Sequence, residues 1–132
     1  FNKSLVNFKG KEIPFLSKNS DKYFGKTNDP IFLLQIFVEE EKTKRSVQSN
    51  QAVSNLDYNL IFSYNLKMKD SECFVLNKTI NSRFTYVPKS SGYNFGSDQS
   101  LKKLYELTVK QNFNLFLNFL SSIQTLECVD ED

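Results

Sequence analysis

The chain has 132 residues, of which 39% are hydrophobic and 24% charged, and its formal net charge is +2. This length favours one domain spanning residues 1–132, and the composition is that of a folded globular chain rather than a disordered one. The small net charge does not indicate nucleic-acid binding, and no stretch approaches the roughly 18 consecutive apolar residues of a membrane span.

The sequence contains no histidine and two cysteines, Cys73 and Cys128. Histidine is the commonest general base and metal ligand, so its absence argues against a hydrolytic triad and against a metal site. No phosphate-binding glycine loop or nucleophile motif occurs either. We therefore expect no enzyme activity, no cofactor and no metal. For the cysteines we expect two unpaired thiols, with pairing in an oxidising compartment as the alternative.

Residues 4–24 predict a strand followed by a short helix. Ser4–Phe8 has the composition of a short strand, and Gly10 ends it. Ile13–Phe24 is weakly amphipathic, with Pro14 suited to the first turn and Gly25 closing the helix.

A second strand follows the breaker Asp29–Pro30. Ile31–Glu39 is strongly apolar and rich in β-branched and aromatic residues, which predicts a central strand. The charged stretch Glu39–Arg45 that comes next predicts a solvated loop.

The clearest periodicity in the chain is that of Tyr58–Lys69, where apolar and polar residues alternate. Such a period of two predicts a strand with one face on a core. A turn at Asp70–Glu72 reverses the chain, and apolar residues then continue on even positions over Phe74–Tyr86. Lys78 and Ser82 interrupt that face, which predicts a bulge or a twist between them. Together the two strands predict a long hairpin.

Pro88 ends the hairpin, and residues 89–96 predict a loop. Ser97 is suited to an N-cap and Asp98 to the first turn of a helix that we expect to run from Asp98 to Ile123. Its expected buried stripe, at steps of three and four residues, consists of Leu101, Leu104, Tyr105, Thr108, Asn112, Leu115, Phe116, Phe119, Leu120 and Ile123.

The second half of this helix also carries Phe113 and Leu117, so it is apolar on more than one side. We expect it to be deeply buried or to meet a partner. The acidic tail, residues 127–132, is expected to fray. The order strand, short helix, strand, hairpin, long helix predicts an α+β fold. In this fold a mostly antiparallel four-stranded sheet is packed on one face by a short N-terminal and a long C-terminal helix.

Basic residues gather in the charged stretch and along the hairpin. Basic groups spaced along strands can hold phosphates, and the plainer alternative is that they oppose aggregation at sheet edges. Lys67 and Lys69 occupy polar positions of one strand, so we expect them to point the same way. The candidate phosphate-binding residues are Lys42, Lys44, Arg45, Lys67, Lys69, Lys78 and Arg83.

Four segments occur in an order that resembles a known family. They are the strand DYNLIFSYNL (Asp57–Leu66), a strand closing on RFTY (Arg83–Tyr86), an SSGY loop (Ser90–Tyr93) and the helix LYELTVKQNFNLFLNFL (Leu104–Leu120). This pattern resembles the LPS-assembly lipoprotein LptE family of Gram-negative bacteria, in its alphaproteobacterial form. Ser4–Leu16 falls where that family has its first strand and the start of its helix, and Asp29–Glu40 falls where it has its second strand. The family's lipid-bearing cysteine and its sequence context do not occur here.

The resemblance implies a non-catalytic protein at the periplasmic face of the outer membrane, held there by a lipid upstream of this chain. It further implies that the domain plugs the LptD β-barrel, helps the barrel assemble and assists insertion of LPS. The family's basic contacts tend to fall in the hairpin region, where Lys78 and Arg83 lie.

Two other non-catalytic classes remain open. A kinetochore-type adaptor domain, similar to the globular head of monopolin subunits, also joins a small sheet to helices and uses a Tyr-x-Pro pattern such as Tyr86–Pro88. The other class is a different envelope lipoprotein or an auxiliary subunit of a lipid transporter. An upstream coiled coil would favour the kinetochore class, and an upstream lipid-attachment motif would exclude it.

Overall fold

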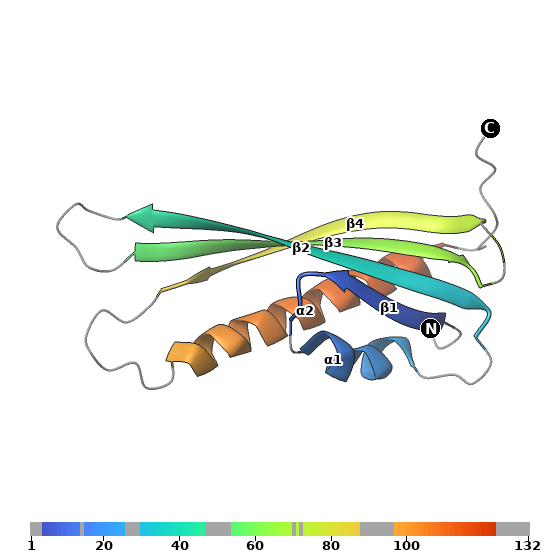
Figure 1. Cartoon of the computed structure of the whole chain (residues 1–132), viewed down its shortest axis with the longest axis horizontal. Helices are drawn as coiled ribbons and strands as arrows, with labels where there is room; N and C mark the ends of the chain where they lie inside the picture. The colour runs from blue at the N-terminus through green and yellow to red at the C-terminus, as the bar shows by residue number, and fades with distance from the viewer. Residues whose placement is uncertain are drawn as a thin grey trace.

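In a computed structural model, the residues that the structure describes are 4–13, 15–25, 30–46, 54–69, 71, 73–87 and 97–123. The predicted α+β class and the predicted order of elements are confirmed (Figure 1). The elements are β1 (Ser4–Gly10), α1 (Phe15–Phe24), β2 (Phe32–Ser46), β3 (Ser54–Met68), β4 (Phe74–Tyr86) and α2 (Ser97–Ser121).

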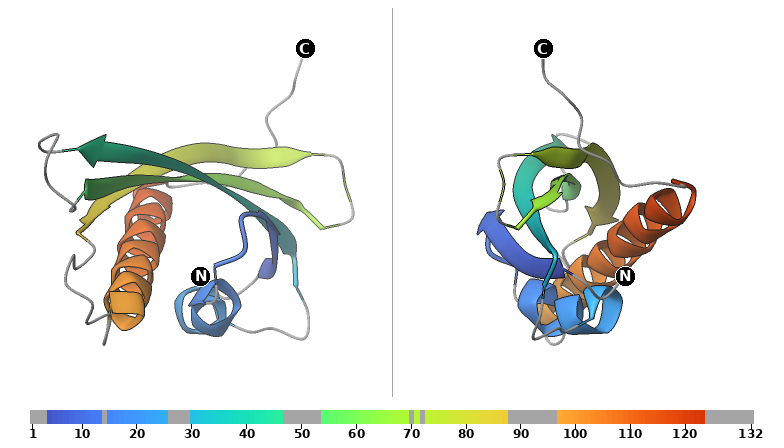
Figure 2. Two further views of the ribbon diagram at one scale, coloured as in Figure 1. Left: turned by 60° about the vertical axis from the view of Figure 1, so that its left-hand side comes forward. Right: turned by 90° about the vertical axis from the view of Figure 1, so that its right-hand side faces the viewer.

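The strands form one sheet in the order β1-β2-β3-β4. The pairs β2–β3 and β3–β4 are antiparallel, whereas β1 is parallel to β2, and α1 lies in the connection that parallel strands require. Both helices lie on the same side of the sheet, which curves around them (Figures 1 and 2). The mostly antiparallel sheet with helices on one face is therefore confirmed. None of the described helices is long and apolar enough to cross a bilayer.

Even-numbered residues form the face of the sheet that the helices cover. Strands pair even position with even position except at the start of β4, where Phe74 pairs with Lys67 and Val75 is buried, so this face is continuous across the sheet. Its side chains with no solvent exposure are Leu34, Ile36 and Val38 of β2 and Leu60, Phe62, Tyr64 and Leu66 of β3. Odd-numbered residues therefore lie on the opposite face, which no described helix covers (Figure 2).

β2 is longer than the sequence predicts. The stretch Glu39–Arg45, expected to be a loop, continues the strand and pairs residue by residue with Asn55–Ile61 of β3. Pairing satisfies the backbone hydrogen-bonding groups that face β3, and the exposed charged side chains stay in water, so their charge does not prevent the strand. For the same reason β3 begins at Ser54 rather than at Tyr58.

The bulge expected between Lys78 and Ser82 is wrong. The register shift lies at the other end of β4, where Leu66 pairs with Leu76 but Lys67 pairs with Phe74. Lys78 and Ser82 keep their helix-facing positions because α2 offers each of them a partner. The Lys78 Nζ lies 4.7 Å from the ring centroid of Phe119, and the Ser82 hydroxyl accepts a hydrogen bond from Asn112.

The second half of α2 is buried between α1 and the sheet, as its apolar composition predicts. The Phe113 ring meets the Phe24 ring of α1 edge-on, with centroids 5.0 Å apart, and the Phe116 ring stacks on Tyr64 of β3. Leu115 was expected in the buried stripe but is 50% exposed, because the sheet and α1 occupy only part of the helix circumference.

A buried polar side chain fixes α2 on the sheet. Asn112 has no solvent exposure, and its Oδ1 accepts a hydrogen bond from the Tyr64 hydroxyl. Its Nδ2 donates to the carbonyl oxygen of Ile80 at 3.1 Å and to the Ser82 Oγ at 2.8 Å. Burial raises the pKa of the Tyr64 phenol far above its ordinary value. These bonds join α2 to both β3 and β4.

Cys73 is disulfide-bonded, so the expectation of unpaired thiols is wrong. Cys128, the other cysteine of the sequence, lies outside the described residues. Other expectations also fall outside them: those for Pro14, Asp29, Asp70, Glu72, Pro88, residues 89–96, the side chains of Ser97 and Asp98, and the tail 127–132.

Candidate binding surface

The uncovered face of the sheet presents residues in rows that cross the strands, all of them odd-numbered except Phe74, which the register shift places beside Lys67. One row aligns four amide side chains, Asn7, Gln35, Asn65 and Asn77. The row on one side of it consists of Leu5, Leu33, Lys67 and Phe74, and the row on the other side of Lys9, Phe37, Ser63 and Thr79. We call these three rows the open face.

The open face mixes hydrogen-bonding groups with exposed apolar side chains. Leu5 is 52% exposed and Phe37 is 40% exposed. A hollow of about 380 Å³ is lined by Lys9, Gln35, Ile36, Phe37, Ser63 and Asn65. Apolar area interleaved with amides and hydroxyls is typical of a surface that binds another macromolecule and is solvated when free.

Farther along the same face, the sheet carries charges of both signs. Glu41, Asn59 and Arg83 form one row, in which the Asn59 Nδ2 donates to the Glu41 Oε1 at 3.0 Å. In the next row the Thr85 hydroxyl donates to the Asp57 Oδ1 at 2.8 Å. A hollow of about 450 Å³ lies over these rows. Glu41 and Asp57 line this hollow together with Arg83, so the hollow carries both signs of charge and is a poor anion site.

The seven basic candidates do not form one site, because strand alternation sends them to different faces. Lys67 and Arg83 both lie on the uncovered side of the sheet. Eight residues along β3 separate Asn59, the partner of Arg83, from Lys67. This is about 27 Å at roughly 3.4 Å per residue. One phosphate group therefore cannot contact both side chains.

The remaining candidates lie elsewhere. Lys42 and Lys44 are exposed on even positions of β2, and the Lys42 Nζ lies 5.7 Å from the Tyr58 ring centroid. Lys78 faces α2, as described above. Lys69 follows the end of β3, and its N–H donates to the Ile31 carbonyl at 2.9 Å. Arg45 belongs to the backbone of β2, and its side chain lies outside the described residues.

Sequence reasoning missed a polar contact on the helix side of the sheet. The Tyr105 hydroxyl of α2 donates to the Glu40 Oε1, and the Lys11 Nζ lies 3.5 Å from the Glu40 Oε2. Burial and the hydrogen bond to Glu40 raise the pKa of Tyr105. The Tyr105 ring also meets Tyr58 and Phe84 edge-on. No sequence signal links these residues, because they come from separate elements.

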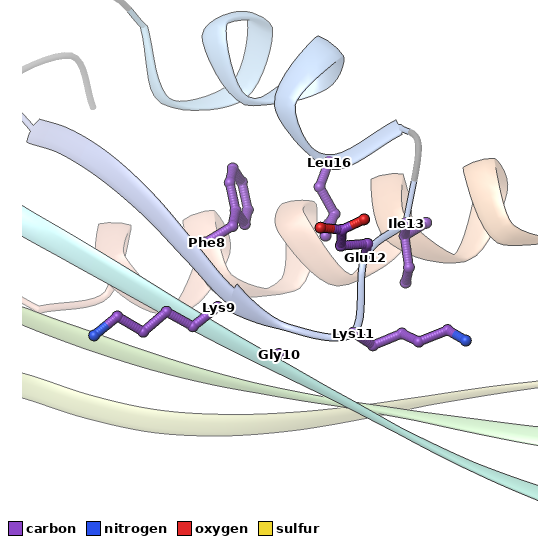
Figure 3. A pocket seen from close by; sticks show the side chains of 7 residues that line it. All are labelled: Phe8, Lys9, Gly10, Lys11, Glu12, Ile13 and Leu16. Carbon is purple, nitrogen blue, oxygen red and sulfur yellow. The ribbon is translucent and has the colours of Figure 1, made fainter.

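Another hollow lies where β1 leaves the sheet for α1. It measures about 670 Å³ and is lined by Phe8, Lys9, Gly10, Lys11, Glu12, Ile13 and Leu16. Figure 3 shows the Lys9 and Lys11 side chains extending in opposite directions. Since Lys11 also pairs with Glu40, the two ammonium groups do not converge on one ligand.

No protein-family model matches the sequence, and no curated protein matches it. Among solved structures, the chain is similar to a minor lipoprotein from Acinetobacter baumannii, with a TM-score of 0.62 and 14% identity over 99% of this chain and 98% of that one. It is similar to rare lipoprotein B from Shewanella oneidensis, with a TM-score of 0.54 and 16% identity over 89% and 93% of the two chains.

A third similar structure, from Caulobacter crescentus CB15, is also described as a lipoprotein. Its TM-score is 0.59 at 10% identity, over 89% of this chain and 88% of that one. At these identities the likeness concerns the fold. Over most of its length, the chain therefore has the fold of bacterial lipoproteins.

Proposed function

We propose that this chain is the folded domain of a non-catalytic outer-membrane lipoprotein of the LptE kind. It docks in the LptD β-barrel, helps the barrel assemble and assists LPS insertion. The observation that carries the proposal is the fold likeness to a bacterial lipoprotein over 99% of this chain and 98% of the other. This match covers nearly the whole of both chains, so it concerns the entire domain and not a single motif.

The one-sided sheet supports this proposal. A folded domain inside a wet barrel has to offer hydrogen-bonding groups to the barrel wall, and the amide row of the open face does so with Asn7, Gln35, Asn65 and Asn77. The exposed side chains of Leu5 and Phe37 add apolar area that docking would remove from water.

The disulfide at Cys73 is a second, independent support. Disulfides form and persist in oxidising compartments such as the bacterial periplasm, and they are rare in reducing ones. The proposal places this domain at the periplasmic face of the outer membrane, tethered by a lipid on a residue that precedes Phe1. Mass spectrometry of the protein isolated from its own cells tests this tether, which is excluded if the mature N-terminus carries no acyl chains.

For LPS, the open face favours Lys67 among the basic candidates. Its row places Lys67 between Leu33 and Phe74, so a cation stands among apolar side chains. That combination suits an anionic amphiphile, because the ammonium group can meet a phosphate while the apolar groups meet acyl chains. Lys67→Glu should weaken LPS binding about tenfold, whereas Lys103→Glu on the exposed side of α2 should not change it.

Co-expression with the LptD barrel tests the proposed function directly. The tagged full-length protein should co-purify with the barrel, and cells that lack it should accumulate misassembled barrel and deliver less LPS to the surface. Barrel assembly and LPS delivery that are unchanged in the deletion strain, with no co-purification, would overturn the proposal.

A further inference from the structure

The distal half of β2 has a free edge among the described residues, because β1 accompanies β2 only as far as Val38. The last hydrogen bond on this side runs from the Lys11 N–H to the Val38 carbonyl at 2.7 Å. Gly10 has a φ of 93°, and a Cβ there would lie 2.2 Å from the Val38 oxygen. Glycine thus lets the chain leave the sheet here. Figure 1 shows β2 and β3 extending well past the end of β1.

Two hydrogen bonds show which way the N–H and C=O groups of each β2 residue point. The N–H and C=O of one strand residue point to the same neighbouring strand, and the direction alternates along the strand. The Val38 carbonyl accepts from Lys11 on the β1 side, and the Ile31 carbonyl accepts from Lys69 of β3. The N–H and C=O groups of even-numbered residues in β2 therefore point toward β1, and those of odd-numbered residues point toward β3.

This alternation continues to the end of the strand, because the register with β3 is unbroken from Phe32 to Ser46. Glu40, Lys42 and Lys44 consequently present their N–H and C=O groups to the free edge. The backbone groups of Glu41 and Thr43 are used by β3. No described strand pairs with the main-chain groups of these three residues on this side, so a further strand can be added here.

The exposed charged side chains beside this edge are sorted by sign. On the helix side, Lys42 and Lys44 are basic and exposed, whereas the Glu40 carboxylate is held by the Tyr105 hydroxyl and by Lys11. On the opposite side, Glu39 and Glu41 are acidic and exposed. A strand added here would bring its own alternating side chains next to these, because directly opposite residues in paired strands share a face.

We propose that the edge at Glu40, Lys42 and Lys44 binds an extended segment of a partner protein as a fifth strand. The segment carries acidic side chains on its helix-side positions and basic ones on the other positions. Main-chain hydrogen bonds supply the affinity, and the sorted charges select this alternation. Charged edges also block indiscriminate pairing. Here the basic side chains on one side of the edge and the acidic ones on the other repel a strand that presents like charges and attract a strand that presents opposite charges. The inference does not depend on the proposed function.

The test uses two synthetic eight-residue peptides of equal composition and the whole chain. In one peptide glutamate and lysine alternate, which sorts the charges by face; in the other they stand in two blocks. Amide hydrogen exchange read by NMR should show Glu40, Lys42 and Lys44 exchanging fast in the free protein. The alternating peptide should slow these three amides about tenfold, and the block peptide should not.

Two proline variants locate the edge. Lys42→Pro removes a free N–H without breaking the β3 ladder, so it should weaken the alternating peptide about tenfold with the hairpin intact. Asn81→Pro is the matched control. By the same alternation, the N–H of Asn81 points away from β3 at the outer edge of β4, so proline there also removes an N–H without breaking the pairing with β3. The proposal is overturned if Asn81→Pro abolishes binding instead or if the alternating peptide does not bind at millimolar concentration. Protection of Lys42 that rises with protein concentration would overturn it too, because a second copy then fills the edge.

Discussion

Replacing Asn112 with leucine should destabilise the fold by about 3 kcal/mol, although leucine has the same branched arrangement of side-chain heavy atoms. Asn112 has no solvent exposure and satisfies the Tyr64 hydroxyl, the Ser82 hydroxyl and the Ile80 carbonyl. Each buried group left without a partner costs roughly 1–3 kcal/mol. The Tyr64 hydroxyl has no other partner in the described hydrogen bonds and contributes most of the loss. Urea unfolding of the whole chain measures the free energy.

The stability change caused by a second substitution, Tyr64→Phe, makes this prediction specific to the bond between Tyr64 and Asn112. In the wild-type background, Tyr64→Phe leaves the Asn112 Oδ1 unpaired and should cost about 1–2 kcal/mol. In the Asn112→Leu background, the same change removes an orphaned hydroxyl and should be neutral or stabilising. Tyr105→Phe is the control, because its hydroxyl bonds Glu40 and its cost should not depend on residue 112. An equal cost of Tyr64→Phe in both backgrounds would refute the pairing of Tyr64 with Asn112.

Three further predictions follow from local geometry. Gly10→Ala should destabilise the fold by about 2 kcal/mol or more, since the added Cβ would lie 2.2 Å from the Val38 oxygen at a φ of 93°; a change under about 0.5 kcal/mol in thermal unfolding would contradict this. Burial raises the pKa of Tyr64, so the folded state holds its proton to higher pH than the unfolded state does, and stability should fall as pH rises above the ordinary tyrosine pKa of 10.0. Tyr64→Phe should reduce that dependence, of which Tyr105 keeps a part because its pKa is also raised, and an unchanged slope counts against the burial argument. Thiol titration of the denatured, unreduced protein should find no free Cys73 thiol, and titration after reduction should find it; a reactive thiol before reduction would exclude the disulfide.

Local periodicity was enough to predict the hairpin of β3 and β4. The alternation over Tyr58–Lys69 assigned the buried face correctly, because side-chain direction in a strand has a strict period of two. The stretch Glu39–Arg45 could not be predicted in this way. It is a strand because it pairs with β3, although its own composition is that of a loop. Long-range pairing of this kind leaves no local pattern.

Polar residues at apolar positions were misread for a similar reason. Lys78 and Ser82 looked like interruptions of a face, yet they are the points where β4 meets Phe119 and Asn112 of α2. The sequence suggested one basic site because the basic residues lie in two nearby stretches of the chain. The alternation of side chains along the strands places them on different faces of the sheet. Sequence separation likewise could not show whether the thiol of Cys73 has a partner, because it does not fix the distance between cysteines.

The proposal that the open face docks against the LptD barrel is tested most directly by co-purification of the barrel with two matched variants. Phe37→Asp places a charge at an exposed site of the open face, and Leu115→Asp places one at an exposed site of α2, where the side chains are 40% and 50% exposed. Both variants should melt as the wild type does. Phe37→Asp should reduce co-purification of LptD about tenfold, as the loss of an interface anchor does, and Leu115→Asp should leave it unchanged. Capture that survives Phe37→Asp and is lost in Leu115→Asp would contradict the account.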